Sequence, residues 1–327
     1  MPNAIITAVS GYVPEKILSN FDLEKMMDTN DEWITARTGI KERRILPDNE
    51  AVTAIGVRCV QDILSKNDID PDSIDMLICA TCTADYIIPD SANSICTESG
   101  LNRAFAYDLN AACSGFVFAL FTASQFIQTG TYKRVIVVGA EKLSSYMNYK
   151  DRATSIIFGD GGGAVLLEPS DDPNLGVLDA VLRGDGIGRE MLRIDAGGSL
   201  KPINAERLEA GDHYVIQDGK KIFKRAVQGM SGTILQVMER NNLSKDDINW
   251  IIPHQANLRI ISAVANALDF PMERVMVNID KYANTSAGTI PLCLWEFESK
   301  MKKGDGIVLT AFGGGFTWGS LFLRWAY

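Results

Sequence analysis

The chain alternates short apolar runs with longer amphipathic segments. Short runs rich in Val and Ile, bounded by Gly, Pro, Asn or Asp, are typical of buried strands. In the first half, this pattern predicts strands at residues 5–9, 76–80, 106–109, 134–139 and 163–167. In the second half, it predicts strands at residues 177–182, 250–253, 275–279, 306–311 and 319–324. Because these runs are mostly apolar, we expect sheets that are covered on both faces.

The longer segments repeat their apolar residues with helical spacing. Helices are predicted at residues 52–67, 114–129, 219–241, 258–268 and 288–301. They lie between the predicted strands, and this alternation indicates an α/β fold with helices on both sides of each sheet.

The two halves of the chain resemble each other. Residues 65–75 align without gaps with residues 239–249, and each stretch leads into an apolar strand. At nearly the same offset, Cys113 falls opposite Asn284. We predict two duplicated halves, residues 1–172 and 173–327, divided within a polar stretch near residues 169–174. Equivalent loops at the carboxyl ends of their strands would then converge on one shared site.

Composition and charge restrict the class of protein. The chain has 327 residues, 46% of them hydrophobic, which is enough for a large core and two domains. Its net charge of -9 argues against general nucleic-acid binding, which requires Lys and Arg. The start of the chain lacks the pattern of a secretory signal, and its apolar segments are too short or too polar to span a bilayer. We expect a cytoplasmic protein.

Six cysteines are present, and in the cytosol they should be reduced. Cys79 and Cys82 form a CxxC pair, but no second pair follows and Cys79 lies in an apolar run. We interpret the pair as ordinary buried cysteines, with a zinc or dithiol redox site as the weaker alternative.

Cys113 stands between a predicted strand and a predicted helix. A helix amino terminus offers free N–H groups and the positive end of the helix dipole, which favour a thiolate and lower the pKa of a thiol. Small neighbours at Ala111, Ala112 and Gly115 leave space for a substrate carbonyl. Local sequence alone supports a nucleophile and a small packed residue equally.

The chain has two histidines. His213 lies in a polar stretch and is expected to be a surface or structural residue. His254 follows the predicted strand 250–253, where a lone histidine is more often structural. The duplication favours a catalytic His254 over a structural one, because it places His254 on the same sheet edge as Cys113.

Asn284 is followed by Thr and Ser, a sequence that ordinarily forms a turn or an N-cap. Its position opposite Cys113 favours a functional role. Three glycines at residues 313–315 follow an apolar strand and could let a backbone N–H approach an oxyanion. Residues 159–163 are also Gly-rich but complete no nucleotide-binding motif, and we predict a turn into strand 163–167.

The predicted helix 219–241 opens with the cations Lys220, Lys221, Lys224 and Arg225. Positive charge is unfavourable at a helix start. The cluster is therefore either a solvated face or a docking surface for a phosphate or an acidic partner.

Several segments together resemble the beta-ketoacyl-acyl-carrier-protein synthase III family. They are Ala-Ala-Cys-Ser-Gly-Phe at 111–116, the stretch 253–263 that begins Pro-His-Gln-Ala-Asn, Asn-Thr-Ser-Ala at 284–287, and Ala-Phe-Gly-Gly-Gly-Phe-Thr-Trp-Gly-Ser at 311–320. Residues 31–40 and 158–161 match as well, and the resemblance runs in order from about Ile5 to Arg324. The family implies a thiolase-like, five-layered αβαβα fold and a homodimer, with no metal or redox cofactor.

The resemblance also implies an activity. Family members condense an acyl-CoA primer with malonyl-acyl carrier protein and so begin fatty-acid synthesis. Cys113 would carry the acyl group, and His254 and Asn284 would stabilise the enolate formed as carbon dioxide leaves. The backbone N–H of Cys113 and Gly314 would form the oxyanion hole.

Binding residues are implied in the same way. Residues expected to contact CoA are Thr29, Trp33, Arg37, Arg152 and Asn257, with Trp33 and Arg152 flanking the adenine. Those expected to contact the carrier protein are Gln255, Ala256, Asn257, Leu258 and Arg259, together with Lys221, Lys224 and Arg225. Ile88 precedes Pro89 in the loop that is expected to reach the partner subunit's acyl pocket, at a position where members that prefer acetyl often carry Phe. We therefore expect tolerance for primers longer or more branched than acetyl.

Two alternatives stay open. One is a related enzyme of secondary metabolism that moves acyl groups to other acceptors. The other is a noncatalytic scaffold that binds carrier protein, which a complete Cys-His-Asn set disfavours.

Overall fold

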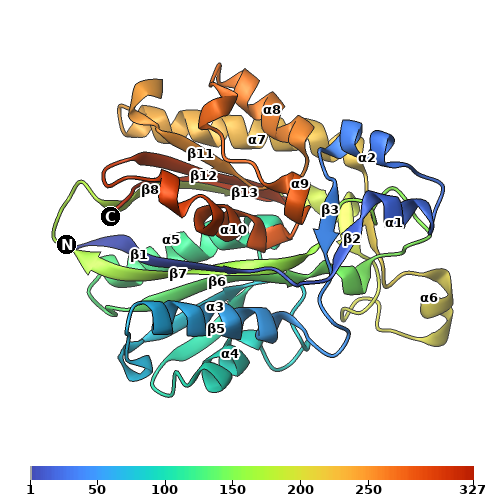
Figure 1. The fold of residues 1–327 in the computed structure, drawn as a ribbon, viewed down its shortest axis with the longest axis horizontal. Helices are drawn as coiled ribbons and strands as arrows, with labels where there is room; N and C mark the ends of the chain where they lie inside the picture. The colour runs from blue at the N-terminus through green and yellow to red at the C-terminus, as the bar shows by residue number, and fades with distance from the viewer. Residues whose placement is uncertain (1) are drawn as a thin grey trace.

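The computed structural model describes residues 2–327, and its elements form five layers, αβαβα (Figure 1). The first sheet has the order β1 (Asn3–Tyr12), β7 (Asp160–Ser170), β6 (Val135–Lys142), β4 (Met76–Ala80), β5 (Phe105–Leu109). The second has the order β11 (Trp250–Pro253), β12 (Gly306–Gly313), β13 (Thr317–Arg324), β8 (Gly176–Gly184). The prediction of an α/β fold with two sheets is confirmed.

Three helical layers enclose the sheets (Figure 1). The middle layer, between the two sheets, consists of α5 (Gly115–Gln128) and α10 (Thr289–Glu296). The outer layers are α3 (Val52–Lys66) with α4 (Ser91–Ser99), and α7 (Gly219–Arg240) with α8 (Leu258–Ala267). α5 is largely apolar and packs its buried residues into a core shared with strands of both sheets. Such all-round burial is what its sequence predicts.

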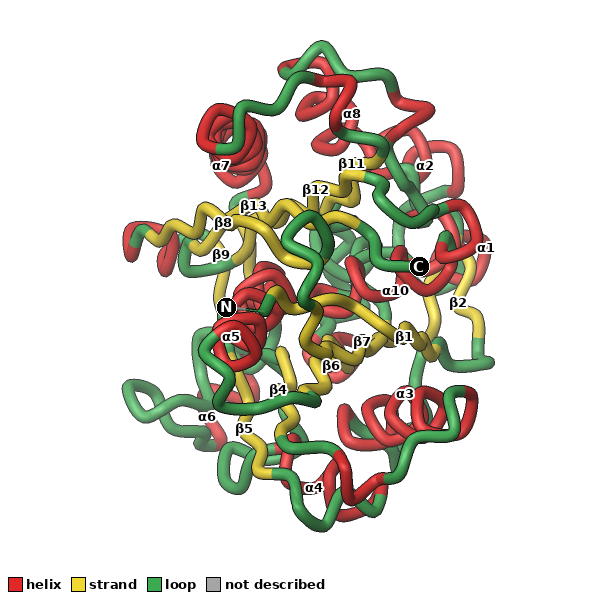
Figure 2. Tube along the Cα trace, turned by 90° about the vertical axis from the view of Figure 1, so that its left-hand side faces the viewer, coloured by secondary structure: helices red, strands yellow, loops and turns green. Residues whose placement is uncertain are grey.

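Smaller elements surround one end of the sheets. β2 (Ile17–Ser19) and β3 (Glu42–Arg44) pair antiparallel. Between them in the sequence lie α1 (Asn20–Glu24) and α2 (Asp31–Thr38). A second antiparallel pair, β9 (Leu192–Ile194) with β10 (Val215–Gln217), carries the projecting α6 (Ala205–Ala210), as Figures 1 and 2 show. None of the helices within residues 2–327 has the length and apolar character needed to cross a membrane.

The two sheets share one strand order. Numbered within each half, the strands of the first sheet run 1-5-4-2-3. The second runs 1-5-4-2, and Val275 forms a single parallel bridge to Ile251 of β11, where strand 3 would lie. The matching strand orders support the division of the chain into two duplicated halves near residue 172, which we keep as a proposal.

Three predicted elements need correction. Residues 275–279 are not a strand, and α9 (Ile279–Tyr282) begins where the strand was expected to end. The predicted helix 288–301 stops at Glu296 and continues only as a 3₁₀ turn, Glu298–Lys300. The glycines at 161–163 lie within β7 rather than in a turn. A Cβ on Gly162 would lie 2.4 Å from the carbonyl oxygen of Gly139, so the close strand approach requires glycine.

Candidate active site

Cys113 lies in a short 3₁₀ turn, Ala112–Ser114, between β5 and α5. The Ser114 hydroxyl donates to the Thr317 carbonyl (2.7 Å), and the Thr317 hydroxyl donates to the Ala111 carbonyl (2.7 Å). These bonds connect the cysteine turn to Thr317, the first residue of β13. A Cβ on Gly313 would lie 2.7 Å from the Cys113 nitrogen, so glycine is needed for this contact.

His254 follows β11 and is 2% exposed. Its backbone N–H donates to the Thr310 carbonyl (2.7 Å), which continues the pairing of β11 with β12 by one residue. Its Nδ1 lies 2.7 Å from the hydroxyl oxygen of Thr289, the first residue of α10. This contact orients the ring through Nδ1 and leaves Nε2 available to a substrate in the cavity that His254 lines.

Both backbone polar groups of Asn284 are hydrogen-bonded. Its N–H donates to the Ile157 carbonyl (3.0 Å), and its carbonyl accepts from the Gly159 N–H (3.1 Å). In its side chain, Oδ1 accepts the Ser286 N–H (2.8 Å). That bond orients the amide, so that Nδ2 is the group left to donate to a substrate.

The three predicted catalytic residues come together. Cys113, His254 and Asn284 line one cavity of about 130 Å³. A neighbouring cavity of about 300 Å³ shares Cys113, Phe158 and Leu192 with it and is also lined by Gly314. Both cavities are mostly apolar, as expected for a site that binds an acyl chain.

Burial favours the neutral forms of the thiol and the imidazole in this site. Burial raises the pKa of the Cys113 thiol to about 11, against a smaller lowering by a hydrogen bond from Ser286. Burial also lowers the pKa of His254 to about 3. The helix terminus was expected to lower the pKa of Cys113, whereas burial, the largest effect on this thiol, raises it.

This arrangement predicts how Cys113 reacts in the free enzyme. We expect its alkylation by iodoacetamide to accelerate about tenfold per pH unit from about pH 7 to about pH 10, because only the thiolate reacts. Peptide mapping separates Cys113 from Cys82, which lines the same cavity. A rate that levels off below about pH 8 would instead reveal a thiol with a lowered pKa.

A polar cluster beside Cys113 was not predicted. The Glu141 carboxylate is fully buried and accepts from the hydroxyls of Thr81 (3.0 Å) and Thr83 (2.5 Å). The Cys82 Sγ lies 3.3 Å from Glu141 Oε1 and 3.8 Å from Ser286 Oγ. Cys79 is fully buried, as predicted, but Cys82 is half-buried and lines the cavity. The only sequence signals were a Thr-Cys-Thr run after β4 and the Ser at 286.

Comparisons with known proteins assign the family. Models described as 3-Oxoacyl-[acyl-carrier-protein (ACP)] synthase III match residues 107–186 and, for the C-terminal part, residues 238–325. Beta-ketoacyl-[acyl-carrier-protein] synthase III of Porphyromonas gingivalis is 51% identical, covering 99% of this chain and 97% of the relative. Synthase III 2 of Bacteroides thetaiotaomicron is 50% identical with the same coverage. The crystal structure of 3-oxoacyl-[acyl-carrier-protein] synthase III from Aquifex aeolicus has a TM-score of 0.91 and 40% identity, covering 98% of this chain and 100% of that one.

The chain belongs to the beta-ketoacyl-[acyl-carrier-protein] synthase III family. It is therefore a condensing acyltransferase of fatty-acid biosynthesis with the thiolase-like fold. The resemblance described from its motifs is confirmed. Among residues 2–327, no group of three or more His, Cys, Asp or Glu side chains is placed to hold a metal ion.

Contacts connect four of the five residues expected to bind CoA. The guanidinium carbons of Arg37 and Arg152 lie 4.6 Å and 5.1 Å from the ring centroid of Trp33 on α2. The Asn257 amide donates to the Arg37 carbonyl (3.1 Å), which connects this cluster to the cavity that Asn257 lines. The hydroxyl oxygen of Thr29 is buried and has no hydrogen-bond partner among the described residues. The contacts thus link Trp33, Arg37 and Arg152 to Asn257, which lines the same cavity as Cys113.

The expected carrier-protein surface is only partly available. Gln255 is fully buried; its amide donates to the Pro253 (2.7 Å) and Met276 (3.2 Å) carbonyls. The prediction that Gln255 contacts a docking protein is therefore wrong. Ala256 and Leu258 are half-buried, Ala256 lines the cavity, and Arg259 alone in residues 255–259 is exposed.

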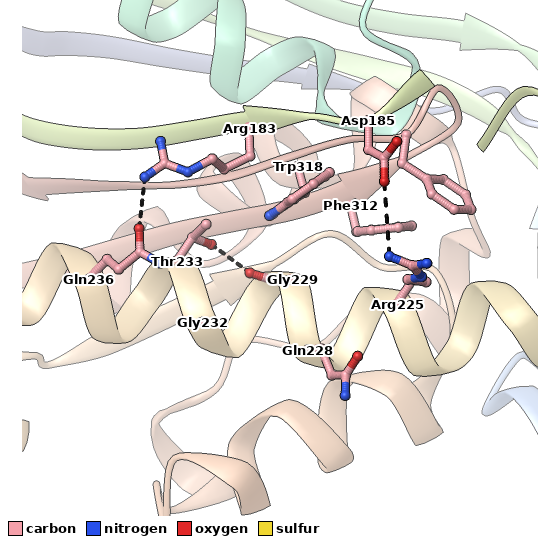
Figure 3. Close-up of a pocket in the computed structure, with 11 residues that line it drawn as sticks. Arg183, Asp185, Arg225, Gln228, Gly229, Gly232, Thr233, Gln236, Phe312 and Trp318 are labelled. Carbon is pink, nitrogen blue, oxygen red and sulfur yellow. Dashed lines mark hydrogen bonds and ion pairs between the residues drawn. The ribbon is translucent and has the colours of Figure 1, made fainter. Parts of the chain in front are cut away.

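The cations at the start of α7 are exposed and lie near Met191. Arg225 also borders a groove against β8 and β13, where it lies 4.0 Å from Asp185 (Figure 3). Lys221 pairs with Asp218 at 2.9 Å. Lys220 and Lys224 make no ion pair within residues 2–327, so these two cations are available to an acidic partner.

Proposed function

We propose that this enzyme condenses an acyl-CoA primer with malonyl-acyl carrier protein through an acyl thioester on Cys113. The products are 3-oxoacyl-acyl carrier protein, carbon dioxide and CoA. The observation that carries the proposal is the single cavity that Cys113, His254 and Asn284 line together. A nucleophile, a proton-transfer group and an aimed amide donor are the parts that this chemistry needs.

In the first half-reaction, the Cys113 sulfur attacks the acyl-CoA carbonyl and CoA leaves as a thiol. The carbonyl oxygen becomes an oxyanion, and the Cys113 N–H and the backbone at Gly314 are the proposed donors. Support comes from the tight contact of Gly313, at the end of β12, with the Cys113 backbone. Preorganised donors of this kind act where charge develops in the transition state.

In the second half-reaction, malonyl-acyl carrier protein replaces CoA and loses carbon dioxide. The enolate oxygen carries the developing negative charge, and Asn284 Nδ2 and His254 Nε2–H are its proposed donors. The orientation of the Asn284 amide by Ser286 supports this role, because it keeps Nδ2 free. The carbanion then attacks the acyl-Cys113 carbonyl and expels the thiolate.

Intact-mass measurement tests the proposal directly. Incubation with an acyl-CoA should add one acyl group, and subsequent malonyl-acyl carrier protein should remove it as 3-oxoacyl-acyl carrier protein. Absence of an adduct with acetyl-, butyryl- and branched acyl-CoA would favour the scaffold alternative. An adduct that transfers to another acceptor without loss of carbon dioxide would favour the acyl-transfer alternative.

The binding residues and the assembly belong to the same proposal. CoA is proposed to enter past Trp33 and Arg152, and the carrier protein to dock near Arg259 and Lys224. A homodimer is supported by the edge position of β5 and by the exposed apolar loop Tyr86, Ile87 and Ile88, which are 67%, 88% and 86% exposed. Such an exposed loop indicates a protein contact. Because its proposed substrates are acyl-CoA and malonyl-acyl carrier protein, we also propose a cytoplasmic location.

Ile88 provides a test of primer choice. Ile88 is 86% exposed in this chain and lines neither cavity, so it is proposed to reach the acyl pocket of the partner subunit. Replacement of Ile88 by Phe is expected to shift the specificity constants toward acetyl-CoA by about tenfold relative to branched acyl-CoA, because a larger side chain would shorten that apolar pocket. Competition between the primers, read as the mass of the first adduct, measures the shift. Ile87→Phe is the matched control one residue away. A wild-type enzyme that accepts acetyl alone would contradict the proposed pocket.

A further inference from the structure

Thr289 makes a contact with the active site that its sequence position does not suggest. Its hydroxyl oxygen lies 2.7 Å from His254 Nδ1 and 3.0 Å from the Ser286 carbonyl oxygen. Thr289 and His254 are each 2% exposed, so water does not substitute freely for either bond. Thirty-five residues separate the two side chains along the chain.

The direction of each hydrogen bond follows from the number of protons. The Thr289 hydroxyl has one hydrogen, and the Ser286 carbonyl can only accept. If that hydrogen goes to Ser286, the hydroxyl oxygen accepts from Nδ1–H and both contacts are hydrogen bonds. If it goes to Nδ1 instead, the contact with Ser286 is lost. The carbonyl also accepts the Thr289 backbone N–H, and its second lone pair receives the hydroxyl.

A buried site favours the arrangement with the larger number of hydrogen bonds. We propose that Thr289 is a positioning residue that holds neutral His254 as the Nδ1–H tautomer, leaving Nε2 as a proton acceptor in the Cys113 cavity. This inference rests on the proposed condensing function. Thr289 thereby prepares His254 for the first half-reaction.

The tautomer determines where each proton moves. As the Cys113 sulfur bonds to the acyl carbon, its proton passes to Nε2, and Thr289 continues to accept Nδ1–H from the resulting imidazolium. When the carbon–sulfur bond to CoA breaks, the leaving thiolate takes the proton from Nε2. The ring returns to its starting tautomer, and the acyl group remains on Cys113.

The second half-reaction consumes one proton from solvent, because the malonyl carboxylate leaves as neutral carbon dioxide. Nε2 takes up that proton and donates to the enolate oxygen beside the Asn284 amide. Carbon–carbon bond formation then expels the Cys113 thiolate, which receives the Nε2 proton and becomes a thiol. Thr289 accepts from Nδ1–H throughout, so its hydroxyl does not need to reverse direction.

Ring nitrogen spectra of the wild-type protein test the tautomer without any substrate. The chain has two histidines, and His213→Gln removes the signals of the other ring. At neutral pH, long-range ¹H–¹⁵N spectra should show a protonated Nδ1 and a bare Nε2 for His254. A protonated Nε2 with a bare Nδ1 would overturn the inference.

Two variants test the role of the hydroxyl. Thr289→Val keeps the shape and removes both hydrogen bonds, so we expect the Nε2–H tautomer to become populated. Single-turnover acylation of Cys113 by acyl-CoA should slow by at least tenfold, with little change in the acyl-CoA concentration that gives half the maximal rate. Thr289→Ser should restore both the spectrum and the acylation rate.

Unchanged spectra in Thr289→Val, or equal loss of acylation in the Val and Ser variants, would mean that Thr289 only packs. If Thr289→Val does not fold, the wild-type and Thr289→Ser spectra still decide the tautomer. Failure of the proposed function would look different, because wild-type enzyme would then form no acyl adduct whatever the tautomer.

Discussion

Replacement of Cys113 by alanine is expected to remove the acyl adduct and to lower the condensation rate by at least about 10³-fold. The primer is held as a thioester on the Cys113 sulfur. Without that sulfur, no group holds the primer while CoA is exchanged for the carrier protein. Intact-mass measurement after exposure to acyl-CoA gives the first result. Formation of 3-oxoacyl-acyl carrier protein gives the second.

Cys82 provides the matched control, because it lines the same cavity and has a thiol of the same size. Burial and the neighbouring Glu141 raise the pKa of Cys82 well above its ordinary value, so it should not replace Cys113 as a nucleophile. Cys82→Ala is expected to keep the adduct, and peptide mapping should locate it at Cys113. An adduct that survives in Cys113→Ala, or that maps to Cys82, would contradict the assignment.

The strands whose ends were predicted correctly are bounded by clear chemical changes. β4 and β11 were predicted to the residue, since each is a short apolar run that follows a polar residue, Asp75 or Asn249. The prediction failed at residues 275–279, where the local pattern is equally apolar. There the Gln255 side chain donates to the Met276 carbonyl and accepts the Asn278 N–H (3.1 Å). A buried side chain thus occupies backbone groups that a neighbouring strand would use.

The same residue explains why the site could be predicted only in part. Gln255 stands in a motif beside His254, and sequence spacing alone cannot separate a docking residue from one buried to support a loop. Cys113 and His254 were found because each follows a strand, β5 or β11, and Asn284 because the duplication places it opposite Cys113. Glu141 and Thr289 were missed because their roles depend on contacts between elements far apart in the chain.

The pKa of Cys113 shows a similar limit. The helix start is visible in sequence and argues for a thiolate, but the degree of burial depends on the whole fold. In the structure burial raises the pKa of Cys113 and lowers that of His254, which favours a neutral thiol and a neutral imidazole in one cavity. With both groups neutral, ionisation would accompany the attack on the substrate, which makes the proton-accepting nitrogen of His254 part of the proposed first half-reaction.

Asn284 separates the two half-reactions, because its amide is needed only when the enolate forms. In Asn284→Ala we expect acylation of Cys113 to stay within a few-fold of wild type, whereas decarboxylation should fall by about 10²–10³-fold, the loss typical of one removed donor. Single-turnover acylation, followed by carbon dioxide release from malonyl-acyl carrier protein, measures both rates on the same enzyme.

Asn284→Asp distinguishes loss of the donor from loss of the turn. Aspartate has the same shape and can still accept the Ser286 N–H, which alanine cannot. It has no Nδ2 to donate, and its negative charge would repel the enolate. We therefore expect its decarboxylation to be at least as slow as that of Asn284→Ala. Near-normal condensation in Asn284→Asp, or acylation that falls in parallel with decarboxylation in both variants, would show that Asn284 maintains the loop rather than stabilises the enolate.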